Sequence, residues 1–128
     1  MKNMTTIGMV VAAASVWLAA IGVQGDWLVK TVRPDRSGRT VVNLDCAFTQ
    51  KETSITGMCR GAEQGGPGTP VTGRVRGDHV EWQFDIALEP NGAKQTTTFI
   101  GTVNRARNTM DGGFTIRDQR GTFTATRR

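Results

Sequence analysis

Few side chains in this chain of 128 residues have the types needed for catalysis, and they lie far apart in the sequence. The single histidine, His79, falls on the polar face of a predicted strand beside a tight turn. Ser37 and Ser54 fall in predicted loops with no base nearby. Because a serine nucleophile needs a base within hydrogen-bond reach, we predict that the protein is not an enzyme.

Two carboxylates share one strand face, Glu81 and Asp85 in the segment HVEWQFDIAL. This face is the polar one, which points to water, so a paired acid–base role is not expected. The glycine-rich segment GGPG at 65–68 lacks the lysine and the hydroxyl residue of a phosphate-binding loop at the required spacing. We therefore expect no cofactor.

The chain contains two cysteines, Cys46 and Cys59. An even pair in an exported protein favours a disulfide, and the alternative is two free buried thiols. Their wide spacing, in a chain with one histidine, argues against a metal site. We expect no bound metal.

The N-terminus has the layout of a secretory signal peptide. Lys2 precedes the apolar run IGMVVAAASVWLAAIGV, and Val23 and Gly25 stand at positions −3 and −1 of a cleavage site after Gly25. The alternative is a single membrane anchor, but a run of about 17 residues is short for a bilayer. We predict a signal peptide over 1–25, one domain over 26–128, a secreted or periplasmic location and no stable membrane span after cleavage.

The chain is basic, with a formal net charge of +5. Its arginines are scattered, and no basic run exceeds two residues. Scattered arginine indicates a solvated surface rather than a nucleic-acid-binding stripe. We therefore expect no nucleic acid partner, and the pattern names no protein partner.

Apolar residues after Asp26 alternate with polar ones, as in half-buried strands. The clearest run places Val80, Trp82 and Phe84 on one face. Turn signals about every ten residues separate eight predicted strands: 26–32, 39–50, 54–62, 70–76, 79–88, 95–103, 109–116 and 121–127. Short connections allow sequential antiparallel pairing, which predicts an all-β, eight-stranded up-and-down meander barrel.

Pairing the last five strands by their turns places apolar residues in three inward rows. The first row is Val71, Phe84, Phe99, Phe114 and Phe123. The second is Gly73, Trp82, Gly101, Gly112 and Ala125, which would give the indole room among glycines. The third is Val75, Val80, Val103, Met110 and Arg127.

The same exercise on the segments 39–50 and 54–62 sets Cys46 opposite Cys59 and Phe48 opposite Gly57. Their sulfurs would lie on the inner face, close enough to bridge if the pair is not hydrogen-bonded. An eight-strand meander has two exposed edges unless the last strand pairs with the first. That closure places Trp27 near Arg127.

Gly25-Asp26-Trp27 at the start of the first strand, with Arg127 near the end of the last, resembles the signature of the calycin superfamily. The chain looks most similar to short lipocalin-like domains of bacterial secreted proteins. The resemblance implies a lipocalin- or avidin-like barrel in which the arginine packs across the tryptophan at the closed end. The Thr-Asp-Tyr motif of lipocalins is not present, because the chain has no tyrosine.

An eight-stranded barrel is either filled by its side chains or holds one small ligand. Residues expected to line a ligand site are Trp82, Phe84, Phe99, Phe114 and Phe123. Loops 33–38, 61–69, 89–94 and 117–120 meet at the open end and carry a basic rim of Arg33, Arg36, Lys94, Arg117 and Arg120. Such a site suits a small apolar or amphipathic anionic ligand. The alternative is a solid barrel that acts as a protein-interaction or inhibitor module.

Overall fold

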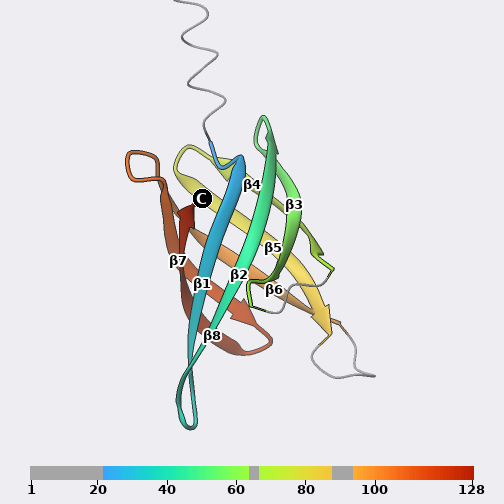
Figure 1. Cartoon of the computed structure of the whole chain (residues 1–128), viewed down its shortest axis with the longest axis vertical. Helices are drawn as coiled ribbons and strands as arrows, with labels where there is room; N and C mark the ends of the chain where they lie inside the picture. The colour runs from blue at the N-terminus through green and yellow to red at the C-terminus, as the bar shows by residue number, and fades with distance from the viewer. Residues whose placement is uncertain (1–21, 64–66, 88–93) are drawn as a thin grey trace, which may run out of the picture.

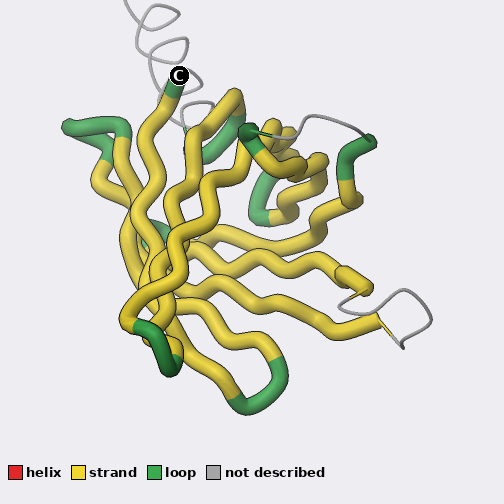
Figure 2. Tube along the Cα trace, turned by 60° about the horizontal axis from the view of Figure 1, so that its bottom comes forward, coloured by secondary structure: helices red, strands yellow, loops and turns green. Residues whose placement is uncertain are grey.

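A computed structural model describes residues 22–63, 67–87 and 94–128, and Figure 2 shows this part of the chain as strands joined by turns. The strands are β1 (Gly25–Asp35), β2 (Gly38–Lys51), β3 (Ser54–Gly61), β4 (Thr69–Arg76), β5 (His79–Ala87), β6 (Lys94–Asn104), β7 (Thr109–Ile116) and β8 (Gln119–Arg127). All eight predicted strands are confirmed. In these ranges no helix is long and apolar enough to cross a membrane.

The strands form one closed antiparallel barrel in sequential order, and β8 pairs back to β1 (Figure 1). Because β8 pairs with β1, neither strand has an unpaired edge along the residues of this ladder. The predicted meander barrel is therefore confirmed, including the pairing of Trp27 with Arg127.

Tight turns make sequential pairing possible. In the hairpin between β4 and β5, Arg76 pairs with His79, so two residues make the turn. Gly77, the first of them, has a φ of 56°. This left-handed conformation carries no steric cost for glycine.

Three of the predicted hairpin registers are confirmed. Cys46 pairs with Cys59 across β2 and β3, and Gly73 pairs with Trp82 across β4 and β5. Phe99 pairs with Phe114 across β6 and β7. The cysteines form a disulfide with a Cα–Cα distance of 4.1 Å, which fits a non-hydrogen-bonded antiparallel pair.

Two predicted registers are wrong by two residues. Phe84 pairs with Thr97 rather than Phe99, so Phe99 lies opposite Trp82. Phe123 pairs with Gly112 rather than Phe114. The predicted rows ran straight across the sheet, but a barrel closes only when its strands are staggered. A shift of two residues supplies stagger and keeps every side chain on its predicted face.

The corrected register changes which glycine makes room for which ring. Trp82 faces Gly73, as predicted, but its other neighbour is Phe99, whose ring stacks on the indole with centroids 3.8 Å apart and 2° between planes. Gly101 and Gly112 flank Phe123 instead. A Cβ on Gly101 would lie 3.0 Å from the Phe123 ring.

Aromatic rings fill the half of the barrel nearest the paired residues Trp27 and Arg127. The Trp82 ring lies 5.2 Å from Phe48 and 5.9 Å from Phe123, measured between centroids. All five phenylalanines of the chain are buried, as the alternation predicted. This half therefore holds a packed aromatic core.

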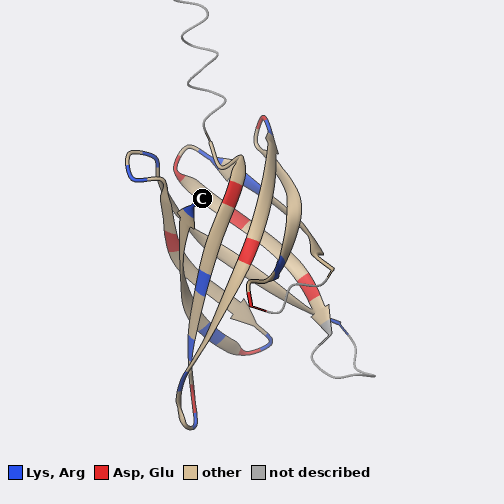
Figure 3. Cartoon of the chain, in the orientation of Figure 1, with Lys and Arg blue, Asp and Glu red and all other residues tan. Residues whose placement is uncertain are grey.

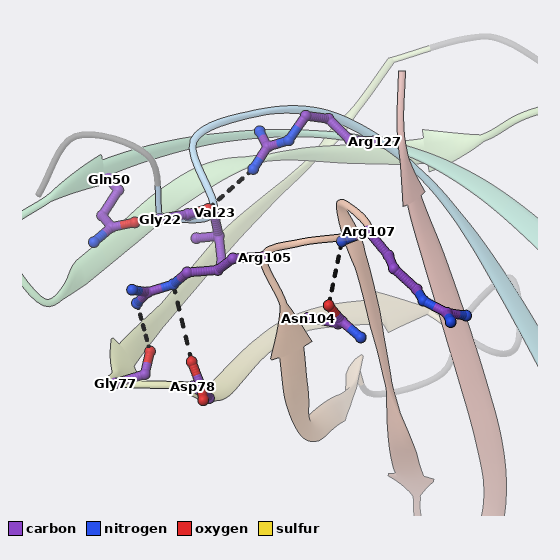
Figure 4. Close-up of polar contacts among 9 residues, drawn as sticks. All are labelled: Gly22, Val23, Gln50, Gly77, Asp78, Asn104, Arg105, Arg107 and Arg127. Atoms are coloured by element: carbon purple, nitrogen blue, oxygen red, sulfur yellow. Dashed lines mark hydrogen bonds and ion pairs between the residues drawn. The ribbon is translucent and has the colours of Figure 1, made fainter. Parts of the chain in front are cut away.

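Residues 22–24 close the end of this packed half. The Val23 side chain is 0% exposed, and the Trp27 indole Nε1 donates to the Val23 carbonyl over 2.9 Å. Figure 4 shows Arg127 reaching the Gly22 carbonyl, with a distance of 2.9 Å. Positions 1–21 of the predicted signal peptide (1–25) lie outside the described residues. Its positions 22–25 are described and belong to the folded barrel.

Candidate functional site: an apolar cavity at the open end

The half of the barrel away from Trp27 and Arg127 is hollow. Its cavity has a volume of about 220 Å³ and is mostly apolar. The lining residues come from β1, β2, β5, β6 and β7, and they are Thr31, Arg33, Thr40, Val42, Leu44, Phe84, Ile86, Thr97, Phe99, Phe114 and Ile116. The interior thus divides into a packed half and an open half.

Three aromatic rings mark the boundary between the two halves. The Phe99 ring stacks on Trp82 on the side of the packed half. Its centroid lies 5.7 Å from the ring centroid of Phe84 and 5.5 Å from that of Phe114. Phe84, Phe99 and Phe114 line the cavity. Trp82 and Phe123, which the sequence also suggested for ligand contact, are buried in the packed half and do not line it.

Two buried threonines add polar groups to the cavity wall. The Thr31 hydroxyl donates to the Val42 carbonyl over 2.8 Å. The Thr97 side chain is 4% exposed, and its hydroxyl has no hydrogen-bond partner within the described part of the chain. A buried hydroxyl without a partner is costly, by roughly 1–3 kcal/mol. A ligand atom that bonds to Thr97 would remove this cost.

A basic side chain, Arg33, lies at the mouth of the cavity. Arg33 lines the cavity, and its Nη1 donates to Oε1 of Gln119. This bond joins β1 to β8 just beyond Val32, where their ladder ends. The other predicted rim residues lie at the same end but do not line the cavity, and they are Arg36, Lys94, Arg117 and Arg120. Figure 3 shows basic residues along the projecting β1–β2 hairpin.

The tip of the β1–β2 hairpin is held by Asp35. Its carboxylate accepts hydrogen bonds from the Thr40 hydroxyl and from the Ser37 backbone N–H, the latter over 2.9 Å. These bonds, with a smaller contribution from the charge of Arg33, hold the pKa of Asp35 below its usual range. The tip therefore keeps its shape while carrying Arg33 at the mouth.

Sequence reasoning missed the aliphatic and threonine part of the lining. Leu44, Ile86 and Ile116 line the cavity and were not among the residues predicted to contact a ligand. Thr97 shares the inward face of β6 with Phe99. The same period-two pattern could have identified it, since a threonine at an inward position of a hollow barrel lines the cavity.

The remaining candidate chemical groups do not meet in one place. His79 is exposed on the outer face, as predicted. Glu81 forms an ion pair with Arg74 over 2.9 Å, and Asp85 accepts from the Thr96 hydroxyl over 2.7 Å. Within the described ranges, no three His, Cys, Asp or Glu side chains lie close enough to hold a metal ion.

A second feature at the open end is the edge of β2. The β2–β3 ladder begins at Leu44 and Gly61, and the Ala62 N–H donates to the Asn43 carbonyl over 2.9 Å. Closer to the tip, β2 has no strand neighbour on that side among the described residues. In a strand, the peptide groups of every second residue point to the same side. Since the Asn43 carbonyl points toward β3, the N–H and C=O of Val41 point to the same, open side. The Val41 side chain is 48% exposed.

The chain matches no protein-family model and no curated protein sequence. The closed antiparallel barrel of eight strands is consistent with a calycin-like fold. The resemblance to the calycin superfamily at the sequence level consists of Gly25, Trp27 and Arg127.

Proposed function

We propose that this protein is an exported, lipocalin-like binding protein that takes one small amphipathic anion into its open half. The observation that carries the proposal is the apolar cavity of about 220 Å³, with Thr97 unpartnered in its wall and Arg33 at its mouth. An apolar cavity of about 150 Å³ holds a molecule the size of benzene. The ligand is therefore small, with an apolar body and an acidic head.

The packed half limits the length of the ligand. Phe99 closes the floor of the cavity by stacking on Trp82, so an acyl chain cannot extend toward the termini. Drug-sized ligands occupy pockets of roughly 300–1,000 Å³, which is larger than this cavity. We expect a medium-chain carboxylate, with octanoate as the probe, to bind better than hexadecanoate.

Calorimetric titration of the full chain with octanoate and octanol tests the proposal. Both should bind, because the apolar cavity dominates, and octanoate should bind more tightly because its carboxylate faces Arg33. Arg33→Gln should weaken octanoate binding about two- to fivefold, as expected for a partly exposed ion pair, and leave octanol binding unchanged. Arg107→Gln, at the opposite end of the barrel, is the matched control.

A cavity-filling variant separates binding inside the barrel from binding on its surface. Leu44→Trp places a larger ring at the cavity wall, where Leu44 is partly buried, and should abolish binding of both probes if the variant keeps its melting temperature. Equal binding by Leu44→Trp and the parent chain would overturn the proposal.

The open edge of β2 supports a second candidate function, a protein-interaction module. An extended peptide could add to the edge through the peptide groups of Val41. Arg39 and Arg36 flank this edge and favour a peptide with acidic side chains, and they disfavour a second copy of this basic chain. On the β1 side of the same hairpin, Pro34 provides no N–H for such pairing.

Fluorescence polarisation with an eight-residue peptide of alternating valine and threonine, carrying two glutamates, tests this second candidate. Val41→Pro should abolish binding because it removes the edge N–H, while Ile100→Pro, on a strand paired on both sides, should unfold the barrel instead. Equal binding of a peptide with lysines in place of glutamates, or self-association of the chain through β2, would contradict it.

A further inference from the structure

We propose that export processing cuts this chain on the N-terminal side of Gly22, so that residues 22–25 remain in the mature protein as the plug of the closed end. The proposal concerns a processing site and does not depend on what the cavity binds. It places the cut several residues before the site after Gly25 that the small-residue pattern alone favours.

Val23 is the side chain that fills the closed end. It is 0% exposed and belongs to the same buried cluster as Trp27 and Val29. Val23 lies in a bend before β1, whereas Trp27 and Val29 point inward from the strand itself. Because Val23 is buried in the same cluster, residues 22–25 pack as part of the barrel and are not a linker to it.

Backbone groups of the plug are bonded to three different parts of the barrel. The Val23 N–H donates to the Gln50 side chain on β2 over 2.8 Å, and the Val23 carbonyl accepts from Trp27. The Arg127 guanidinium on β8 donates to the carbonyls of Gln24 and Gly22. Figure 4 shows Gly22 and Val23 between Gln50 and Arg127.

A cut after Gly25 would leave these partners incomplete. The Trp27 indole would lose the acceptor of its buried N–H, and such a loss is costly because the group is shielded from water. The Arg127 guanidinium would lose two hydrogen-bond acceptors, the backbone carbonyls of Gln24 and Gly22. The cavity left by Val23 would open the packed half to solvent.

The sequence offers small residues further upstream. Ala19 and Ala20 lie near the end of the apolar run and place a small residue at position −1 of a cut. Position −3 would be Trp17 or Leu18, so such a cut meets one half of the small-residue pattern, and the contacts of residues 22–25 are what favour it. A cut at these alanines retains every residue of the plug. It also keeps Gly25 of the barrel signature with the mature chain.

Intact mass spectrometry of the full chain after secretion from a bacterial host tests the proposal. The mature mass should correspond to a chain that begins at Ala20, Ile21 or Gly22. A mass that begins at Asp26, or the mass of the uncut chain, would overturn it.

A pair of variants in the same secreted chain tests the role of the plug. Val23→Ser should lower the melting temperature by at least about 8 °C, on the usual scaling for a domain of this size. Asp26→Ser, which alters an exposed side chain just outside the plug, should change it little. If both variants melt with the parent protein, Val23 is not a plug and the proposal fails.

Discussion

The guanidinium of Arg127 lies 4.4 Å from the centroid of the Trp27 ring, and the two residues pair across β1 and β8. Arg127 also donates to the Asn108 side chain over 3.2 Å. One side chain thus joins the last strand, the first strand and the β6–β7 turn. Burial lowers the pKa of Arg127 from its ordinary value, but an arginine stays charged at neutral pH.

Replacing this arginine should destabilise the barrel. Arg127→Ala removes the cation–π contact and the hydrogen bonds to backbone carbonyls, and we expect a loss of about 1–3 kcal/mol in the free energy of unfolding. Denaturant titration measures it. Arg107→Ala, an exposed arginine in the turn at the same end, should stay within about 0.5 kcal/mol of the parent. Equal stabilities of the two variants would remove this role from Arg127.

Gly73 is predicted to tolerate no side chain. A Cβ at this position would lie 2.7 Å from the Trp82 Cα and would collide with the Glu81 carbonyl. Gly73→Ala should therefore lower the free energy of unfolding by about 1–3 kcal/mol. Gly113→Ala is the matched control, because its Cβ would meet nothing closer than the Gly121 carbonyl at 3.4 Å. A harmless Gly73→Ala would show that the close strand contact is relaxed in solution.

The two cavity threonines should respond in opposite directions to the same change. Thr97→Val removes a buried hydroxyl without a partner and should stabilise the ligand-free protein by about 1 kcal/mol. Thr31→Val removes a hydroxyl bonded to the Val42 carbonyl and should destabilise it by a similar amount. Thermal and denaturant unfolding of both variants checks the contrast. If Thr97→Val is as destabilising as Thr31→Val, the Thr97 hydroxyl is bonded in solution.

Asp35 should titrate below the ordinary pKa of an aspartate, because its charged form accepts hydrogen bonds from Thr40 and Ser37. A depressed pKa in the folded state means that the stabilisation is present above the unfolded pKa and is lost as the pH falls through the folded value. NMR titration of the Asp35 carboxyl measures this. Thr40→Val should raise the pKa toward the ordinary value, and an unchanged value would exclude the Thr40 bond as its main cause.

The disulfide between Cys46 and Cys59 should stabilise the protein by restricting the unfolded chain. On the chain-entropy account, a loop of this length is worth roughly 3 kcal/mol. The double variant Cys46→Ala, Cys59→Ala should lose about this amount in denaturant titration. It should also become insensitive to reductant, unlike the parent. A parent chain whose stability does not change with reductant would contradict the role of the bridge.

Alternation specified which side of the barrel each strand residue faces, and the inward positions of Phe48, Phe84 and Phe114 followed from it. Turn length specified the registers of the tight hairpins, including Gly77–Asp78. At β7–β8 the predicted connection 117–120 was two residues too long, because Ile116 pairs with Gln119 and the turn is Arg117–Asp118. Alternation could not reveal the errors at β5–β6 and β7–β8, because a shift of two residues leaves it unchanged.

The division of the interior into two halves could not be read from the sequence for the same reason. With Phe99 placed opposite Phe84, four phenylalanines formed one row and Trp82 lay among glycines in the next. With Phe99 opposite Trp82, the indole and Phe123 fill the closed half, and the layer above them is open. Val23 was assigned to position −3 of the cleavage site, and alternation could not place it in the core because it lies in a bend before β1.

The central claim, that a small amphipathic anion enters the open half of the barrel, is tested most directly by methyl NMR during titration with octanoate. Leu44, Ile86 and Ile116 report from the cavity wall, Ile55 from the packed half, and Ile100 from the outer face. The proposal predicts saturable shifts at Leu44, Ile86 and Ile116, with Ile55 and Ile100 unchanged. Shifts confined to Ile100, or no shifts in the cavity methyls at saturating octanoate, would contradict it.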